Sequence, residues 1–220
     1  MTYLELCQKV WLLCNMVGST PATMEPPANR SDAKIAAWVS AAWDDIASRR
    51  EWTWLWRECE FDTQGSDIDY TGADAGVARW LNGFMVRDKA AGLSDQRPLP
   101  FVDRGDLFAY GAYGEREAKR PRGIVEMPDK RLRLLDPPDT IYTITAQYYA
   151  VPTPLTGDAD VPAMPGDLHM LIVYEAMRAY SGDEDAPEVL SMAVRGAAPL
   201  WAALHSRCTP SMRITPAPIA

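Results

Sequence analysis

The sequence predicts an α+β fold: N- and C-terminal helices form an α-helical bundle, with an inserted antiparallel β domain and an extended C-terminal tail. Three observations predict it. Apolar residues recur at three-and-four spacing near both ends of the 220-residue chain, short alternating runs fill the middle, and the last twelve residues show neither pattern. We expect residues 1–56 and 157–208 to form the bundle, residues 57–156 the β domain and residues 209–220 the tail.

The N-terminal segment contains two predicted helices. Thr2, followed three residues later by Glu5, forms a capping-box pattern, and the apolar stripe that follows ends before Gly18. After a loop with three prolines, Ser31 opens a second amphipathic segment that ends near Arg50. The apolar stripe of this second helix supplies four expected core residues of the bundle: Trp38, Val39, Trp43 and Ile46.

Three tryptophans alternate where the second helix meets the middle of the chain, namely Trp52, Trp54 and Trp56. Side chains of a strand alternate between its two faces, so a single core cannot cover all three if this segment is a strand. The residues therefore indicate either a hinge packed on both faces or a surface that another chain covers.

Six short runs predict the strands of the β domain. Their bounds are 57–61, 78–86, 97–102, 123–127, 131–135 and 140–149. The last run is dense in β-branched and aromatic residues and follows a turn at 136–139, which favours a strong strand. We expect 131–135 to pair with it as a hairpin.

Helical periodicity returns after the linker 151–162. Pro165 marks the start of a third helix and Gly182 its end, and a fourth helix follows Pro187, with a kink expected at Pro199. The third helix supplies the remaining expected bundle residues: Leu171, Ile172 and Tyr174.

Composition narrows the class of protein. With 47% apolar and 24% charged residues the chain resembles soluble globular proteins, and its longest strongly apolar run, 170–174, is far too short to span a bilayer. Four cysteines without CxxC spacing indicate reduced thiols and synthesis in the cytoplasm. A net charge of −8 argues against a protein whose main task is to grip the phosphate backbone.

No catalytic or metal-binding pattern stands out. The sequence lacks the GxSxG, GxxxxGK[ST], GxGxxG and HExxH motifs, and its two histidines, His169 and His205, are expected to be structural. Asp67 opens a calcium-loop-like pattern, but its twelfth position is Ala78 instead of glutamate, which favours a turn. We expect no catalytic residue, no metal, no cofactor and no enzymatic activity. A carboxylate-based hydrolase stays open, because such carboxylate pairs have no spacing rule.

The densest basic stretch, residues 116–133, contains seven cations and three acidic residues, and Glu115 directly precedes it. One interpretation is a strand platform that stacks single-stranded nucleic acid, with contacts from Arg120, Arg122 and Arg131. The interspersed carboxylates favour the other interpretation, a solvated face of mixed charge.

Several of these segments together resemble one family. The stretches 3–10, 37–46, 52–56 and 135–176 look like head-to-tail adaptor (connector, head completion) proteins of tailed bacteriophages, and the resemblance spans residues 1–207. It implies a virion structural protein of the neck, between capsid and tail, made in the host cytoplasm. Its helical bundle would build a homo-oligomeric ring, usually of twelve copies, in which the bundle residues above lie in the core or at the interface.

The resemblance also implies partners. These are the portal protein at the capsid vertex, a downstream tail or nozzle protein, and double-stranded DNA that passes through the lumen without sequence readout, with no membrane involved. An acidic lumen would repel the DNA and let it slide. Pro199 puts in doubt whether the last helix continues unbroken toward the portal. The C-terminal segment would dock on the portal through Thr209, Pro210, Met212, Arg213, Ile214, Pro216 and Ile219.

Overall fold

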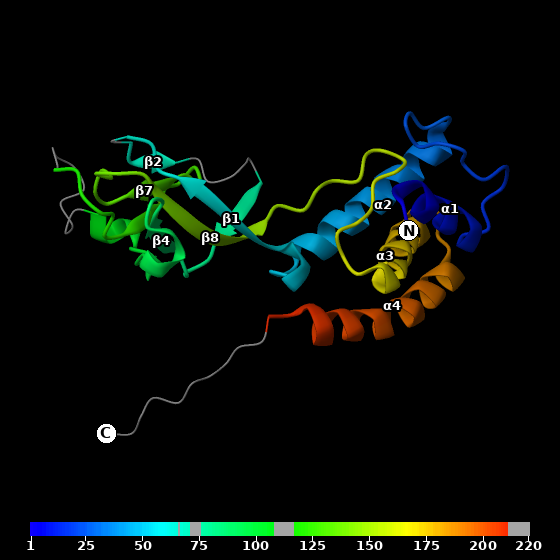
Figure 1. Cartoon of the computed structure of the whole chain (residues 1–220). Coiled ribbons are helices and arrows are strands. Elements are labelled where there is room, and N and C mark those ends of the chain that lie inside the picture. Colours follow the sequence, from blue (N-terminus) through cyan, green and yellow to red (C-terminus); the bar gives the residue numbers. More distant parts are fainter. Residues whose placement is uncertain (66, 71–75, 108–116, 211–220) are drawn as a thin grey trace, which may run out of the picture. The chain divides into compact units, whose positions relative to one another are not determined.

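The computed structural model describes residues 1–65, 67–70, 76–107 and 117–210, and Figure 1 follows the chain from blue to red. Within these residues the protein has four α-helices and two antiparallel sheets, which confirms the predicted α+β class. The chain forms two compact units. The helical unit combines Met1–Trp54 with the chain from Pro152 onward, and the β unit is Leu55–Val151.

The helical unit is built around α3 (Met170–Asp183). Helices α1 (Tyr3–Leu13), α2 (Arg30–Ser48) and α4 (Pro187–Cys208) all pack against it, and α1 also packs against α2. This central position explains why α3 has a wide buried face, which comprises Leu171, Ile172, Val173, Ala176, Met177 and Ser181.

Local signals set the starts of the first two helices. The predicted capping box is confirmed, because the Thr2 hydroxyl accepts from the Glu5 amide and the Glu5 carboxylate accepts from the Thr2 amide. The helix ends at Leu13, well before Gly18. Helix α2 begins at Arg30 instead of Ser31, since the Asn29 side chain accepts from the backbone amide of Asp32, 2.9 Å away, and so acts as its cap.

The expectation that Gly182 ends the third helix was wrong, and the doubt about the continuity of the fourth helix is resolved. Gly182 lies inside α3 and does not end it; a glycine in a helix lowers stability without breaking it. Helix α4 continues through Pro199 to Cys208, so the proline does not shorten it. Pro199 is exposed, and it removes only one backbone hydrogen-bond donor from a helix of 22 residues.

The larger sheet of the β unit is centred on β8 (Tyr142–Ala150). Strand β1 (Trp56–Asp62) pairs along one side of β8 from Trp56↔Tyr149 to Asp62↔Thr143. On the other side lie β3 (Val77–Trp80) and β4 (Met85–Asp88), and β4 also pairs with β5 (Arg97–Pro98). A smaller sheet has the order β2 (Asp69–Tyr70), β7 (Leu132–Leu134) and β6 (Ile124–Glu126).

Residues of both sheets share the main core of the β unit. Trp80 and Phe84 lie 6.0 Å apart between ring centroids and pack with buried aliphatic side chains of the smaller sheet. The buried members of this core are Trp80, Phe84, Val86, Leu99, Ile124, Leu132, Leu134, Tyr142, Ile144 and Ala146.

The predicted hairpin between 131–135 and 140–149 was wrong, because β7 pairs with β6 and β2 and belongs to the other sheet. The turn after β7 does not reverse the chain onto its own strand. Its first residue, Asp136, is fully buried and is held instead by Arg122, with contacts of 2.7 and 3.0 Å.

Two predicted strands were also longer than the structure has them. The run 78–86 is divided into β3 and β4, since Gly83 between them has a φ of +144°, which other residues rarely adopt. The run 97–102 contains only the two-residue β5, because Pro98 and Pro100 have no backbone N–H to donate. The two-residue β2 was not predicted.

Candidate assembly surfaces

The seven predicted bundle residues lie on α2 and α3. Trp38 and Tyr174 are half-buried. The other five are buried in the helical unit, namely Val39, Trp43, Ile46, Leu171 and Ile172.

Trp38 joins α2 to the C-terminal end of α3. Its ring meets the Tyr180 ring edge to face, with centroids 5.6 Å apart and planes at 85°. The Lys34 ammonium lies 5.9 Å from the Trp38 ring centroid and pairs with Asp183 at 2.5 Å and Glu184 at 3.3 Å. These contacts give Trp38 a role within its own chain.

Tyr174 sets how closely α4 approaches α3. A Cβ built on Gly196 of α4 would lie under 3.0 Å from three carbon atoms of the Tyr174 ring. A tyrosine ring is rigid, so it cannot bend away from an added methyl group as a flexible side chain does. The two helices therefore pack at this distance because residue 196 has no side chain.

A cluster of aromatic residues fastens the C-terminal end of α4. The Trp52 ring is fully buried and its Nε1 donates to the Ile46 carbonyl at 2.8 Å. The His205 ring lies 5.5 Å from the Trp52 ring and 5.6 Å from the Trp201 ring, between centroids. Trp43 and Trp54 extend the stack, and we call Trp43, Trp52, Trp54, Trp201 and His205 the tryptophan cluster.

Of the three alternating tryptophans, Trp52 and Trp54 do not lie in a strand, so a strand over the whole segment was wrong. Trp52 precedes a 3-10 turn, Thr53–Leu55, that includes Trp54, so their rings stack at 6.4 Å with planes only 9° apart. Only Trp56 lies in a strand, and its side chain is 43% exposed. The four-residue spacing of Trp201 and His205 on α4 is the sequence signal that points to this cluster.

The predicted docking tail begins directly after this anchored helix end. Cys208 is buried, Thr209 is half-buried and Pro210 is exposed. Arg207 pairs with Asp167, just before α3, and so holds the last turn of α4 from a second side. The other predicted docking residues lie outside the described part of the chain: Met212, Arg213, Ile214, Pro216 and Ile219.

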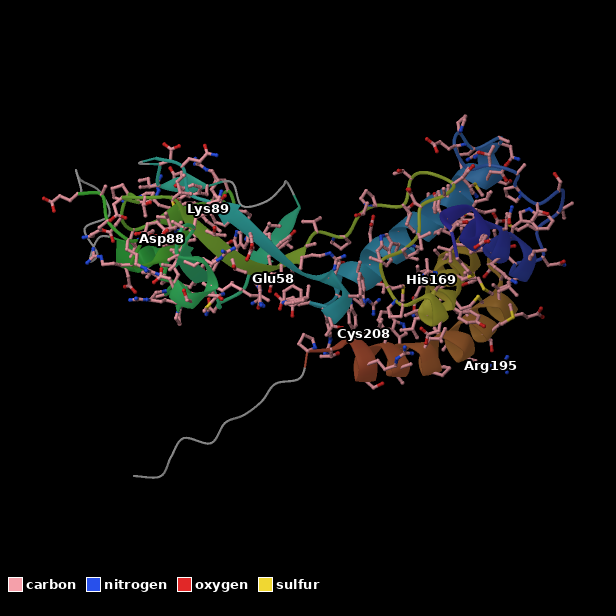
Figure 2. The ribbon with its side chains drawn as sticks, in the orientation of Figure 1. Glu58, Asp88, Lys89, His169, Arg195 and Cys208 are labelled. Atoms are coloured by element: carbon pink, nitrogen blue, oxygen red, sulfur yellow. The ribbon has the colours of Figure 1, made fainter. Side chains whose placement is uncertain are left out.

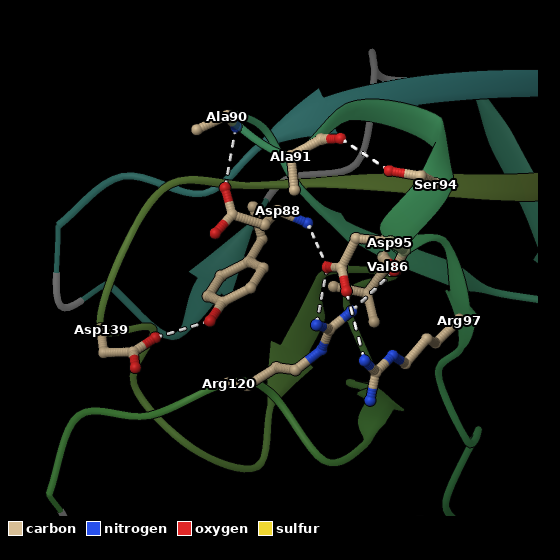
Figure 3. A network of polar contacts seen from close by, with 10 residues as sticks. Val86, Asp88, Ala90, Ala91, Ser94, Asp95, Arg97, Arg120 and Asp139 are labelled. Atoms are coloured by element: carbon tan, nitrogen blue, oxygen red, sulfur yellow. Dashed lines mark hydrogen bonds and ion pairs between the residues drawn. The ribbon is translucent and has the colours of Figure 1, made fainter.

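Arg120 is part of a polar network in the β unit (Figure 3). Its guanidinium donates to the Asp95 carboxylate at 2.7 Å, to the Asp95 carbonyl at 3.1 Å and to the Val86 carbonyl at 3.3 Å. The Asp88 backbone amide and Arg120 both donate to the Asp95 carboxylate and hold its pKa below the usual range. The network fixes the loop between β4 and β5, which contains the 3-10 turn Gly92–Asp95. Leu93 in this turn is 72% exposed, and we call the segment the Leu93 loop.

Arg122 and Arg131 are also paired within the chain. Burial acts to raise the pKa of Asp136, but hydrogen bonds from Arg122 and Lys119 outweigh it and keep the group ionised with a lowered pKa. Arg131 contacts Asp129 at 2.5 Å. The three arginines proposed to contact nucleic acid thus each hold a carboxylate of the β unit, and these contacts account for them without a ligand.

The remaining candidate groups have structural surroundings. His169 is buried in the helical unit (Figure 2), where its Nε2 lies 3.0 Å from the Met164 carbonyl and burial lowers its pKa. Asp69, from the calcium-like stretch, accepts two hydrogen bonds from Arg133 at 2.6 and 2.7 Å. Among the described residues there is no group of His, Cys, Asp and Glu that could hold a metal ion. No helix in the same part of the chain is long and apolar enough to cross a membrane.

The sequence was compared with known proteins. A family model described as SU10 adaptor protein matches residues 1–211, and so covers both the helical unit and the β unit. No curated protein matches the chain.

Proposed function

Because the chain belongs to the SU10 adaptor protein family, we propose that it forms the ring that joins the portal at the capsid vertex to the tail. The family makes the protein a structural, adaptor-type component of a bacteriophage virion. In the proposal, twelve copies surround a lumen through which double-stranded DNA passes. The observation that carries it is the family match across both units of the chain.

The helical unit suits the body of such a ring. Three helices pack around α3, and the tryptophan cluster and the Arg207–Asp167 pair hold the end of α4 in place. A ring subunit needs this rigidity, because small errors in the angle between neighbours accumulate around the ring and prevent closure. The β unit, with its rigid Leu93 loop, is then available for the downstream tail or nozzle protein.

The C-terminal segment is proposed to dock on the portal. Residues 209–220 include three prolines and one charged residue, Arg213, and they follow an anchored helix end. A segment of this composition contributes little to a core but suits an extended contact with a partner. The net charge of −8 is compatible with a lumen that repels DNA.

Co-sedimentation with the portal of the same phage tests the docking. Removing residues 211–220 is expected to weaken portal binding at least about tenfold, the equivalent of about 1.4 kcal/mol, while circular dichroism and the melting temperature stay unchanged. Arg213→Ala removes only the one charged side chain of the segment and is expected to weaken portal binding less than the truncation does. Portal binding that survives the truncation at full strength would contradict the docking role, as would loss of the fold.

A further inference from the structure

Helix α4 exposes three large apolar side chains. Leu190 is 41% exposed, Met192 is 37% exposed and Val194 is 48% exposed. On its packed side the helix buries only Ala193, Ala197, Leu204 and Cys208. Between Glu188 and Arg207 its one Lys, Arg, Asp or Glu residue is Arg195. A helix that is apolar on two sides needs a second partner, because surface helices are normally polar on the side that faces water.

The exposed apolar residues form a ridge. Leu190, Val194 and Ala198 follow each other at intervals of four, so they lie one above the other along the same side of α4. Leu190 and Val194 are the large members, and Ala198 is exposed as well. We call these three residues the α4 ridge. The buried stripe of α4 faces α3, so the ridge lies beside the contact that the chain makes with itself.

Arg195 lies next to the ridge and has no acidic partner in the described residues. Its Nε donates to the Ser191 carbonyl of its own helix at 3.2 Å. Figure 2 shows its side chain directed away from the neighbouring helices. A partner that covers the ridge will therefore meet a cation at its border, and a carboxylate there would complement it.

The same unit carries a complementary surface on α2. The side of α2 opposite its buried residues exposes Ala37 and Ala41, followed by Asp44. Asp44 makes no ion pair with the described residues, whereas its neighbour Asp45 pairs with Arg49 at 2.5 Å. On this α2 face the two alanines lie between Lys34, which is already paired with Asp183 and Glu184, and Asp44, which has no ion pair among the described residues. The Asp44 carboxylate is therefore left to match the unpaired Arg195 beside the ridge.

We propose that the α4 ridge of one copy packs on the α2 face of a second copy, with Arg195 paired to Asp44 across the contact. This rests on the proposed ring and names the surfaces that close it. When each copy places its α4 ridge on one neighbour and offers its α2 face to another, the contact is head to tail, which is the kind that generates rings. Two α4 ridges facing each other would instead place the Arg195 cations of both copies in one contact.

Native mass spectrometry of the full chain, with and without the portal, tests the contact. Val194→Asp is expected to raise the concentration needed for half-assembly at least about tenfold, because it buries an unpaired charge. Leu93→Asp is the matched control, since Leu93 is exposed in the β unit and should leave assembly unchanged. Melting temperatures of both variants should stay near that of the unmodified protein.

A charge swap tests the pairing. Arg195→Glu and Asp44→Arg are each expected to weaken assembly, and the double variant should restore it. Rings that form normally in Val194→Asp, or a double variant no better than the single ones, would overturn this inference while leaving the adaptor function intact. An unmodified chain that forms no ring even with its portal would overturn the proposed function itself.

Discussion

Gly196 stabilises the packing of α4 on α3, although glycine is normally unfavourable inside a helix. At an exposed position inside a helix, replacing glycine with alanine raises the free energy of unfolding by about 0.5–1 kcal/mol. At position 196 the added methyl group would enter the Tyr174 ring, so Gly196→Ala is expected to lower the free energy of unfolding by about 1–3 kcal/mol. Urea denaturation measures this change.

Gly182→Ala is the matched control for that substitution. Gly182 is also helical, but nothing lies within 4 Å of a Cβ built there, so alanine should stabilise the protein slightly. Equal stability gains in both variants would show that α3 and α4 do not need the close approach.

Asp136 makes the stability of the β unit depend on pH. Its folded pKa lies below the unfolded value, so its contribution is present above the unfolded pKa of about 3.9 and is lost as the pH falls through the folded pKa. Arg122→Ala removes the main partner and leaves burial, which raises the pKa of Asp136. We expect this variant to be less stable near pH 7, with Lys119 as the remaining partner of Asp136, and its acid unfolding to begin at higher pH.

Thermal unfolding between pH 3 and pH 7 measures the effect of Arg122→Ala. Arg97→Ala is its control. The Arg97 side chain is 68% exposed and makes a long contact of 3.4 Å with Asp95, which Arg120 already holds at 2.7 Å. Identical pH profiles for Arg122→Ala and the unmodified protein would refute the role given to this pair.

At the level of elements, the tryptophan cluster connects α2 to the end of α4. Trp52 is fully buried, so Trp52→Ala is expected to cost about 3–5 kcal/mol by leaving a cavity. Trp56 on β1 is 43% exposed, so Trp56→Ala should lower the free energy of unfolding much less. Chemical denaturation followed by circular dichroism compares the two variants, and similar losses for both would speak against the cluster as the anchor of α4.

The helices were easier to predict than the strands. A helix is specified locally, and Thr2 with Glu5 was enough to locate the start of α1. Strand pairing depends on residues far apart in sequence, and nothing in 131–135 indicated that β7 pairs with residues 124–126 instead of the neighbouring β8. The partners of Arg120 and Arg122 were hidden for the same reason, since Asp95 lies 25 residues away from Arg120 in sequence.

At the level of the whole molecule, the division into a helical unit and a β unit suits a protein with separate contacts to make. The helical unit carries the α4 ridge and the anchored helix end, while the β unit carries the exposed Leu93 loop on its own sheet core. Sequence patterns indicated helical ends and a β middle. They did not reveal the α4 ridge, because the exposure of Leu190 and Val194 depends on which side of α4 packs against α3, and that packing joins separate elements.

The copy number of the assembled protein tests the central claim most directly. Native mass spectrometry of the chain bound to its portal should show a complex containing twelve copies of the 24.4 kDa protein, about 290 kDa beyond the mass of the portal. A ring of this kind would establish the adaptor function. A chain that stays monomeric at all concentrations and does not bind the portal would contradict it.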